Sequence, residues 1–423
     1  MLEKFQKSEF TRNVFTLTSG TAIAQAIPVV LSPVLSRLYS PEDFGILALF
    51  MSVAAVLSVI ATGRYELAIM IPENKKDAYN VLAISLLISF VTGILALILV
   101  LLLRKPAVVF FDEPNIGPWF FLIPVVVLFA GIYQSFNYWS TRQKTFKLNA
   151  VSRVSQSTAN VITSLGLGIA KAGPAGLIAG YIIGQVFAGL ILMVNFFKNM
   201  KEFFVQVSWQ DMKANAHKYR SFLRINTPHA FIDSLQDNGI VYVIMYFFSK
   251  MILGSYSFAY RLLKLPVGLI GGSIYQVFYQ KASELAAKGE DIRPMILKIY
   301  KRLFGWGLPF FIILFLFTPA IFGFIFGENY RTSGEIARIL IPWIFINFIV
   351  SPVSCVALIK NKQKQAMYFT FADITFKLTS IIIGGIFENY FLAFVIMSIL
   401  CSLLLSYACY WYYQIAGTNH SYS

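Results

Sequence analysis

Eleven ionisable side chains lie within stretches of sequence that are otherwise apolar enough to cross a membrane as helices. A charge in hydrocarbon costs roughly 3 kcal/mol or more, so such a group normally faces a water-filled cavity or an opposite charge. Seven of the eleven are basic and four are acidic, and they are spread over many of the apolar stretches. The sequence therefore predicts a hydrophilic cavity between several helices, lined by members of this set: Arg37, Arg64, Glu66, Arg153, Arg224, Asp233, Asp237, Arg261, Lys264, Asp373 and Lys377.

Basic side chains are the larger group. Arg261 and Lys264 lie well inside the stretch 254–280, too far from its ends to reach lipid headgroups, so we expect them to face the cavity. Cations without nearby acids attract anions, and guanidinium suits phosphate oxygens particularly well. Lys377 lies four residues after Asp373, so these two either face the cavity or neutralise each other along one helix. The predicted cationic set is Arg64, Arg224, Arg261, Lys264 and Lys377, although Arg224, like Arg37 and Arg153, could also extend to the headgroups.

The four acids are candidates for binding a proton or a cation. Asp233 and Asp237 are neighbours on one helix face, so their like charges repel. Deep in a membrane, one of the two would hold a proton or a cation near neutral pH. We expect the ion-coupling residues to be among Glu66, Asp233, Asp237 and Asp373, with H+ or Na+ as the ion and no other cofactor. The alternative, that these acids are partners of the cations, stays open.

Uncharged polar residues follow the same helix faces. Gln25 belongs to a series with Thr18, Thr21, Ser32 and Ser36 at spacings of three, four or seven residues. Pro28 and Pro33 interrupt that helix and could kink it. Asn226 begins the corresponding series that contains the two aspartates. We therefore expect Gln25 and Asn226 to line the cavity.

The composition indicates a membrane protein. The chain has 423 residues, of which 57% are hydrophobic and 13% charged, more apolar surface than a soluble protein can bury. Backbone groups in lipid must be satisfied within their own segment, so we predict an all-α, polytopic fold. We expect twelve spans, at about 13–37, 44–71, 78–103, 118–140, 148–170, 174–197, 221–248, 254–280, 303–326, 336–359, 365–387 and 391–414.

The net charge of +15 follows the predicted topology. If the N-terminus is cytoplasmic, the inner segments hold 22 Lys and Arg residues and the outer segments hold 6. Such a positive-inside bias predicts that both termini are cytoplasmic. The basic excess therefore does not indicate nucleic-acid binding.

The sequence contains no recognisable catalytic motif. We find no nucleotide-binding P-loop, nucleophile elbow or metal-ligand spacing, and the three cysteines and three histidines are scattered. We therefore expect no catalytic residues, no metal site and no enzymatic activity. Charged groups on many membrane helices without such a motif are typical of a transporter.

Two similar turns suggest that the chain has two halves. Residues 1–197 form one predicted six-helix bundle and residues 221–423 the other, joined by a basic cytoplasmic linker, 198–220. Phe203, Phe204 and Trp209 suggest that part of this linker lies at the inner membrane surface. The serine-to-glycine turns Ser40–Gly45 and Ser249–Gly254 have equal length, and each leads into the second helix of its half. Repeats of this kind place a substrate path at their interface.

Three stretches carry a family resemblance: Asn13–Phe50, Gln134–Val161 and Arg261–Leu285. With these, the chain resembles the O-antigen-type polysaccharide flippases of the multidrug/oligosaccharidyl-lipid/polysaccharide exporter superfamily. The two serine-to-glycine turns match a recurring element of that family. The similarity covers essentially the whole chain.

The resemblance implies two six-helix bundles forming a V around a cationic cavity, which Arg64, Arg224, Arg261 and Lys264 would line. The substrate would be an oligosaccharide on undecaprenyl diphosphate, moved from the cytoplasmic to the periplasmic leaflet of a bacterial inner membrane. Besides this lipid-linked substrate and membrane lipids, the expected partners are polymerase and chain-length proteins of the same pathway. The alternatives are a multidrug cation exporter of the same superfamily, which would need a mainly acidic cavity, and a membrane polysaccharide polymerase or ligase, which usually needs a large outer loop.

Overall fold

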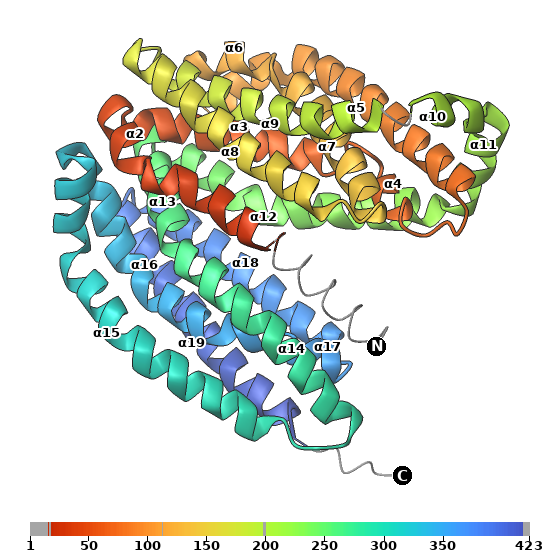
Figure 1. Cartoon of the computed structure of the whole chain (residues 1–423). Coiled ribbons are helices and arrows are strands. Elements are labelled where there is room, and N and C mark those ends of the chain that lie inside the picture. Colours follow the sequence, from red (N-terminus) through yellow and green to blue (C-terminus); the bar gives the residue numbers. More distant parts are fainter. Residues whose placement is uncertain (1–15, 17, 112, 198–199, 418–423) are drawn as a thin grey trace. The chain divides into compact units, whose positions relative to one another are not determined.

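The predicted all-α fold is confirmed. The structure is a computed structural model that describes residue 16 and residues 18–111, 113–197 and 200–417, and within these residues it contains helices and no strand (Figure 1). Ten helical segments are long and apolar enough to cross a membrane. They are Thr18–Leu38, Pro41–Ser58, Lys75–Phe110, Gly117–Arg142, Pro174–Phe196, Lys250–Ala286, Arg293–Phe326, Glu328–Ile359, Gln363–Ile386 and Tyr390–Ile415.

The other two predicted spans also form helices, but these are more polar. The span predicted at 148–170 is α8, Phe146–Ile169, and the one predicted at 221–248 contains α12, Thr227–Phe247. Asn149 and Arg153 interrupt the apolar sequence of α8, and Asp233 and Asp237 interrupt that of α12. A helix with such a polar face needs neighbouring helices or water on that side.

Contacts between residues divide the chain into two compact units. Unit 1 contains the residues up to Tyr39 and Ile46–Val241, and unit 2 contains Ser40–Gly45 and the residues from Tyr242 onward. We predicted two bundles separated by the linker 198–220. By contacts between residues, the chain divides within α12, and the linker groups with unit 1. The predicted bounds of the two six-helix bundles stay a prediction.

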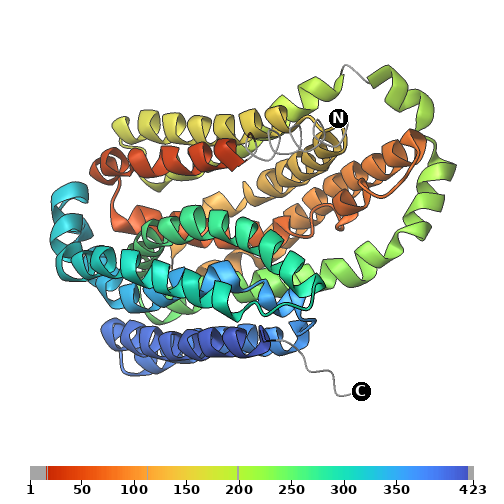
Figure 2. The same ribbon diagram turned by 60° about the horizontal axis from the view of Figure 1, so that its bottom comes forward.

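Unit 1 is a bundle of antiparallel helices. Helices α8 and α9 pack along each other, as do α5 and α7 (Figures 1 and 2). The elements of unit 1 are α2 (Ser32–Leu38), α3 (Pro41–Ser58, whose first residues belong to unit 2), α4 (Tyr65–Ala68), α5 (Lys75–Phe110), α6 (Gly117–Phe120), α7 (Ile123–Arg142), α8, α9 (Pro174–Phe196), α10 (Met200–Gln206), α11 (Trp209–Lys218), the π-helical turn η3 (Phe222–Asn226) and most of α12.

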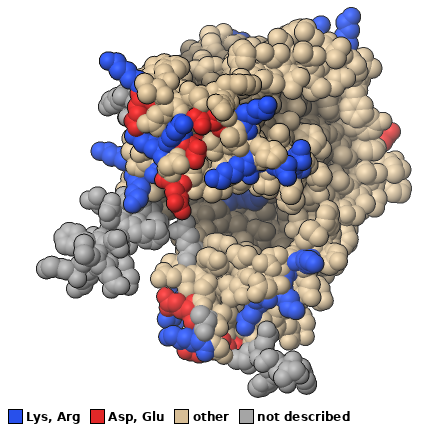
Figure 3. Space-filling model, turned by 90° about the vertical axis from the view of Figure 1, so that its right-hand side faces the viewer, with Lys and Arg blue, Asp and Glu red and all other residues tan. Residues whose placement is uncertain are grey.

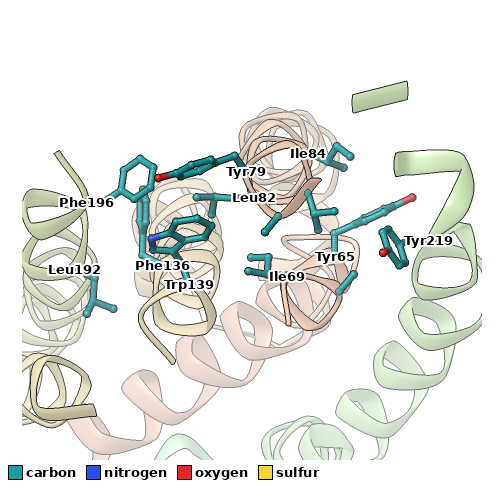
Figure 4. Packing of buried hydrophobic residues seen from close by; sticks show 13 residues of the cluster. Tyr65, Ile69, Tyr79, Leu82, Ile84, Phe136, Trp139, Leu192, Phe196 and Tyr219 are labelled. Carbon is teal, nitrogen blue, oxygen red and sulfur yellow. The ribbon is translucent and has the colours of Figure 1, made fainter. Parts of the chain in front are cut away.

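An aromatic cluster joins the ends of α5, α7 and α9 (Figure 4). The ring of Tyr79 stacks on Trp139 with centroids 4.5 Å apart, and Phe196 meets Trp139 edge to face at 5.7 Å. Tyr65 of α4 and Tyr219, after α11, are also buried in this cluster. Each such ring pair contributes about 0.5–1.5 kcal/mol beyond the burial of its area. The cluster therefore fixes α4 and the linker helices relative to α5.

Ion pairs hold the linker helices against the start of α5. Lys75 donates to Glu202 of α10 at 2.6 Å, and Lys76 lies 2.7 Å from Asp211 of α11. These hydrogen bonds lower the pKa of each carboxyl group, because the lysines stabilise the charged form. On this face of unit 1, basic and acidic side chains gather close together, whereas much of the surrounding surface is uncharged (Figure 3). Trp209 is 72% exposed here, as expected of a residue at a membrane surface.

Unit 2 is a second helical bundle. Helices α15 and α16 pack along each other, as do α18 and α19. Its elements are α13 (Lys250–Pro266), the π-helical turn η4 (Val267–Gly271), α14 (Gly272–Ala287), α15 (Arg293–Phe326), α16 (Arg331–Val350), α17 (Val356–Ile359), α18 (Gln363–Ile386) and α19 (Tyr390–Ile415).

The two serine-to-glycine turns contact each other within unit 2. A Cβ atom added to Gly45 would lie 1.9 Å from the carbonyl oxygen of Lys250, and one added to Gly254 would lie 1.7 Å from that of Pro41. Beside this contact, the ring of Phe44 packs edge to face on Phe258, with centroids 5.2 Å apart. Only glycine allows two helix starts to approach this closely. The repeat seen in the sequence is thus a site of backbone contact in the structure.

Candidate functional site: charged groups of the membrane helices

The helix predicted at 44–71 is broken, and this corrects the expectation of a continuous span. Helix α3 ends at Ser58, and α4 begins at Tyr65. Between them, Gly63 and Arg64 both adopt left-handed conformations, with φ of 59° and 61°. A non-glycine residue in this region costs about 1–2 kcal/mol, so the surrounding packing must hold Arg64 in place. Neither residue type nor hydrophobic periodicity indicated this break.

The break brings Arg64 and Glu66 together. Nη1 of Arg64 lies 3.5 Å from Oε1 of Glu66, and the hydroxyl of Thr62 donates a short hydrogen bond to Oε2. Glu66 is only 1% exposed, whereas Arg64 is 28% exposed. The sequence assigned these two residues to different roles, one for an anion and one for a coupling ion. The structure makes them a single ion pair within unit 1.

Two further groups of unit 1 interact with this pair or with its neighbour Tyr65. Tyr138 of α7 interacts electrostatically with both Arg64 and Glu66. Arg224, in η3, interacts in the same way with Tyr65, and its own side chain is exposed. Asn226 ends the same π-helical turn and is partly buried. The predicted residues Arg64, Glu66 and Arg224 therefore lie in one neighbourhood, and Tyr138 is an addition that the sequence did not indicate.

On α12, Asp233 pairs with a histidine. Nδ1 of His229 lies 2.9 Å from Oδ2 of Asp233, and both side chains are more than half exposed. His229 belongs to the same polar series as Asn226 and the two aspartates but was not among the predicted site residues. Its spacing of four residues from Asp233 was the available signal for this pair. Asp237 is exposed and forms no ion pair within the part of the chain that the structure describes.

In unit 2, aromatic rings lie beneath two of the predicted cations. Nζ of Lys264 lies 5.0 Å from the ring centroid of Tyr260, one turn earlier on α13. Nζ of Lys377 lies 4.9 Å from the ring of Trp343 on α16. The rings of Tyr260 and Trp343 are themselves stacked, with centroids 5.7 Å apart. These contacts link Lys264 and Lys377 through two rings that no sequence pattern had singled out.

Lys377 also forms an ion pair along its own helix. Its ammonium group donates a short hydrogen bond to Oδ2 of Asp373, four residues earlier on α18. The sequence left two alternatives open for Asp373 and Lys377, facing the cavity or neutralising each other. Their contact along α18 is the one expected for mutual neutralisation. Arg261, by contrast, is exposed on α13 and has no acidic partner among the described residues.

The predicted site residues thus form two groups, one in each unit. Unit 1 holds Arg64, Glu66, Arg224, Asn226, Asp233, Asp237 and the exposed Gln25, and unit 2 holds Arg261, Lys264, Asp373 and Lys377. In the described ranges, no three His, Cys, Asp or Glu side chains are placed to hold a metal ion together. Both groups contain basic side chains that can donate hydrogen bonds to an anion. The unit 1 group also contains three acids, Glu66, Asp233 and Asp237.

Solved structures with a similar architecture include a flippase and several transporters. The chain is similar to a lipid II flippase, MurJ, in an inward closed conformation, with 14% identity and a TM-score of 0.67 over 94% of this chain and 87% of that one. It is also similar to a MATE transporter from Vibrio cholerae, with 14% identity and a TM-score of 0.57 over 96% of both chains. A transporter of the MOP superfamily from Pyrococcus furiosus gives 13% identity and a TM-score of 0.56, over 96% of this chain and 95% of that one. No curated protein matches the sequence.

The fold and the embedded charges therefore define a multi-pass membrane protein that shares its architecture with solved flippases and transporters. The family profile described as polysaccharide biosynthesis protein matches residues 34–335. The chain belongs to this family, which confirms the resemblance noted from the sequence.

Proposed function

We propose that this protein moves an oligosaccharide linked to undecaprenyl diphosphate from the cytoplasmic to the periplasmic leaflet of a bacterial inner membrane, by alternating access. The product would feed the synthesis of a surface polysaccharide such as O-antigen, capsule or exopolysaccharide. Family membership supports the link to polysaccharide synthesis, and the fold supports transport.

The observation that carries the proposal is the imbalance between paired and unpaired cations. Arg64 and Lys377 each have an acidic partner nearby. Arg224, Arg261 and Lys264 are exposed and lack such a partner within the described residues. Unpaired cations on membrane helices are costly unless an anion or water meets them. A diphosphate head group supplies such an anion and accepts several hydrogen bonds from guanidinium and ammonium groups.

Coupling to an ion gradient is part of the proposal. Glu66, Asp233, Asp237 and Asp373 are the candidate sites for H+ or Na+. Asp237 is the most available of them, since it is exposed and the described residues give it no ion-pair partner.

The polymerase and chain-length proteins of the same pathway are the expected partners, and both termini are expected in the cytoplasm.

The test replaces the two unpaired cations of α13. Arg261→Ala and Lys264→Ala should each reduce surface polysaccharide at least about tenfold, the effect of losing about 1.4 kcal/mol of binding. Lipid-linked oligosaccharide should accumulate in the cytoplasmic leaflet, while protein levels stay normal. Lys288→Ala, an exposed lysine after α14, is the matched control and should leave output unchanged. Normal polysaccharide output from both α13 variants would contradict the proposal.

Export of organic cations is the competing function. The exposed acids of α12, Asp233 and Asp237, favour it, and MATE transporters share the fold. Cells that express the protein would then expel a cationic dye, and Asp237→Asn would abolish the efflux. Under the proposed function, dye efflux is absent, and lipid-linked oligosaccharide accumulates when the gene is deleted.

A further inference from the structure

Glu66 is an almost fully buried acid next to an incompletely satisfied arginine. An ionised carboxylate is costly to bury unless it is paired and hydrogen-bonded. Its side-chain partners are the hydroxyl of Thr62, which donates to Oε2, and Nη1 of Arg64, which lies 3.5 Å from Oε1. Thr62 and Arg64 belong to the short break between α3 and α4, and Glu66 lies in the first turn of α4, so the pair forms without help from a distant element.

Arg64 keeps unused binding capacity in this arrangement. A guanidinium group has five N–H donors, and a well-matched carboxylate takes two of them in parallel. Here one nitrogen approaches Glu66 at the upper limit of hydrogen-bond length, and the buried Nε has no hydrogen-bond partner among the described residues. The side chain is 28% exposed, so part of it remains open to a ligand. Glu66 therefore holds Arg64 only loosely.

The groups around Glu66 are mainly neutral or basic. Helix α4 packs against α5, α7 and η3. From α7, Tyr138 interacts electrostatically with both members of the pair, and Arg142 donates to the carbonyl oxygen of Ile69 at the end of α4. From η3, Arg224 interacts electrostatically with Tyr65. Helix α5 carries Lys75, Lys76 and Asp77 at its first turn and Arg104 and Lys105 near its other end. The two lysines pair with the linker helices instead, and Asp77 accepts a hydrogen bond from Asn215 of α11. Among the described residues, Glu66 is the one acid that forms an ion pair with Arg64.

We propose that Glu66 is a built-in competitor for the anionic cargo at Arg64, and that a proton taken up by Glu66 from water releases Arg64 to bind the diphosphate. This inference rests on the proposed function and adds a regulatory step to the same site. With Glu66 charged, the carboxylate occupies the guanidinium. With Glu66 neutral, the guanidinium lacks its internal anion and binds a phosphate oxygen in its place. Because linkage is reciprocal, binding of the diphosphate then favours uptake of one proton by the same factor.

The experiment measures binding of farnesyl diphosphate, a short prenyl diphosphate, to the full-length protein in detergent by calorimetry. At pH 7.5, Glu66→Gln should bind it about 5- to 150-fold more tightly than the wild type, the usual range for a coupled site. Between pH 8 and pH 6, the wild-type affinity should rise relative to that of Glu66→Gln. Protonation of the diphosphate probe itself changes the affinity of both proteins equally. It therefore cancels when the wild-type affinity is divided by that of Glu66→Gln.

Two more variants show whether Glu66 acts through Arg64. Thr62→Val removes the hydrogen bond that favours the charged carboxylate, so binding should tighten in the same direction but less. This variant also serves if Glu66→Gln fails to fold. In an Arg64→Gln background, the Glu66→Gln substitution should have no further effect, because coupled residues are not additive. Glu202→Gln, an exposed acid paired with Lys75 in the same unit, is the matched control and should bind like the wild type.

The outcomes separate the inference from the proposed function. If the wild type binds the probe and both Glu66→Gln and Thr62→Val bind it no more tightly, the competitor role is wrong and the proposed cargo stands. If neither the wild type nor Glu66→Gln binds it, the diphosphate assignment is wrong, and the inference is overturned with it.

Discussion

At the scale of single residues, aromatic rings determine where two of the cations lie. Lys264 lies over Tyr260 and Lys377 over Trp343, and the two rings stack on each other. A cation over a ring gains about 0.5–2 kcal/mol, and more when water is excluded. Tyr260 is therefore a positioning residue for Lys264 and does not itself need to touch the cargo.

Replacing the aromatic ring of Tyr260 should weaken transport without abolishing it. Tyr260→Leu should raise the substrate concentration for half-maximal transport by about 2- to 30-fold, the equivalent of 0.5–2 kcal/mol. Tyr260→Phe keeps the ring and should restore the wild-type value, since no hydrogen bond of the Tyr260 hydroxyl is found among the described residues. The measurement is flipping of a lipid-linked oligosaccharide in reconstituted vesicles. Equal impairment of the Phe and Leu variants would argue against the ring as the active feature.

At the scale of the elements, the first turns of α3 and α13 are in backbone contact, and a glycine in each helix allows this close approach. Gly45 approaches the backbone of Lys250, and Gly254 approaches that of Pro41, within distances that no Cβ atom tolerates. Both obstacles are backbone carbonyl groups at helix starts, which cannot move aside as a flexible side chain can. Moreover, Ser40–Gly45 belongs by its contacts to unit 2, although it connects two helices of unit 1. The turn is thus a fixed attachment of the chain to unit 2.

Alanine at either glycine should be strongly destabilising. We expect Gly45→Ala and Gly254→Ala each to lower the free energy of unfolding by about 3 kcal/mol or more, beyond the usual cost of overpacking. The measurement is the midpoint temperature of thermal unfolding in detergent, or the yield of folded protein. Gly166→Ala in α8 is the matched control, because an added Cβ there meets nothing within 4 Å. A midpoint for Gly254→Ala as high as that of Gly166→Ala would contradict this account.

At the scale of the whole molecule, the distribution of basic residues predicts the orientation in the membrane. The linker helices α10 and α11 pack on the start of α5, which the topology predicted from the sequence would put at the cytoplasmic surface. The exposed Trp209 and the surrounding Lys and Arg residues of that face fit a layer of lipid headgroups. We therefore expect this end of unit 1 to lie at a membrane surface.

Reporter fusions test this orientation. Green fluorescent protein fused after residue 417 should fluoresce, because this reporter folds in the cytoplasm. Alkaline phosphatase fused at Lys171, between α8 and α9, should be active, because this loop is predicted to lie on the outer side. The opposite pair of results would place the termini on the outer side. A phosphatase fusion within α11 should be inactive and serves as the internal control.

The sequence by itself determined the class of the molecule and several local pairs. Apolar stretches long enough to cross the bilayer are expected to form helices. In lipid, each backbone N–H and C=O group must form its hydrogen bond within its own segment. Contacts at a spacing of four residues, such as Asp373 with Lys377, follow from helix geometry alone. The same spacing could have predicted His229 with Asp233, and Tyr260 with Lys264.

Only the tertiary structure decided the rest. The break at Gly63 and Arg64 depends on two left-handed residues that surrounding packing stabilises, and hydrophobic periodicity does not encode such a conformation. Trp343 meets Lys377, and Gly45 meets Lys250, across long separations in the sequence. Periodicity reports which face of a helix is apolar but not which other helix it meets. For that reason the charged residues could be listed from the sequence, whereas their partners required the folded chain.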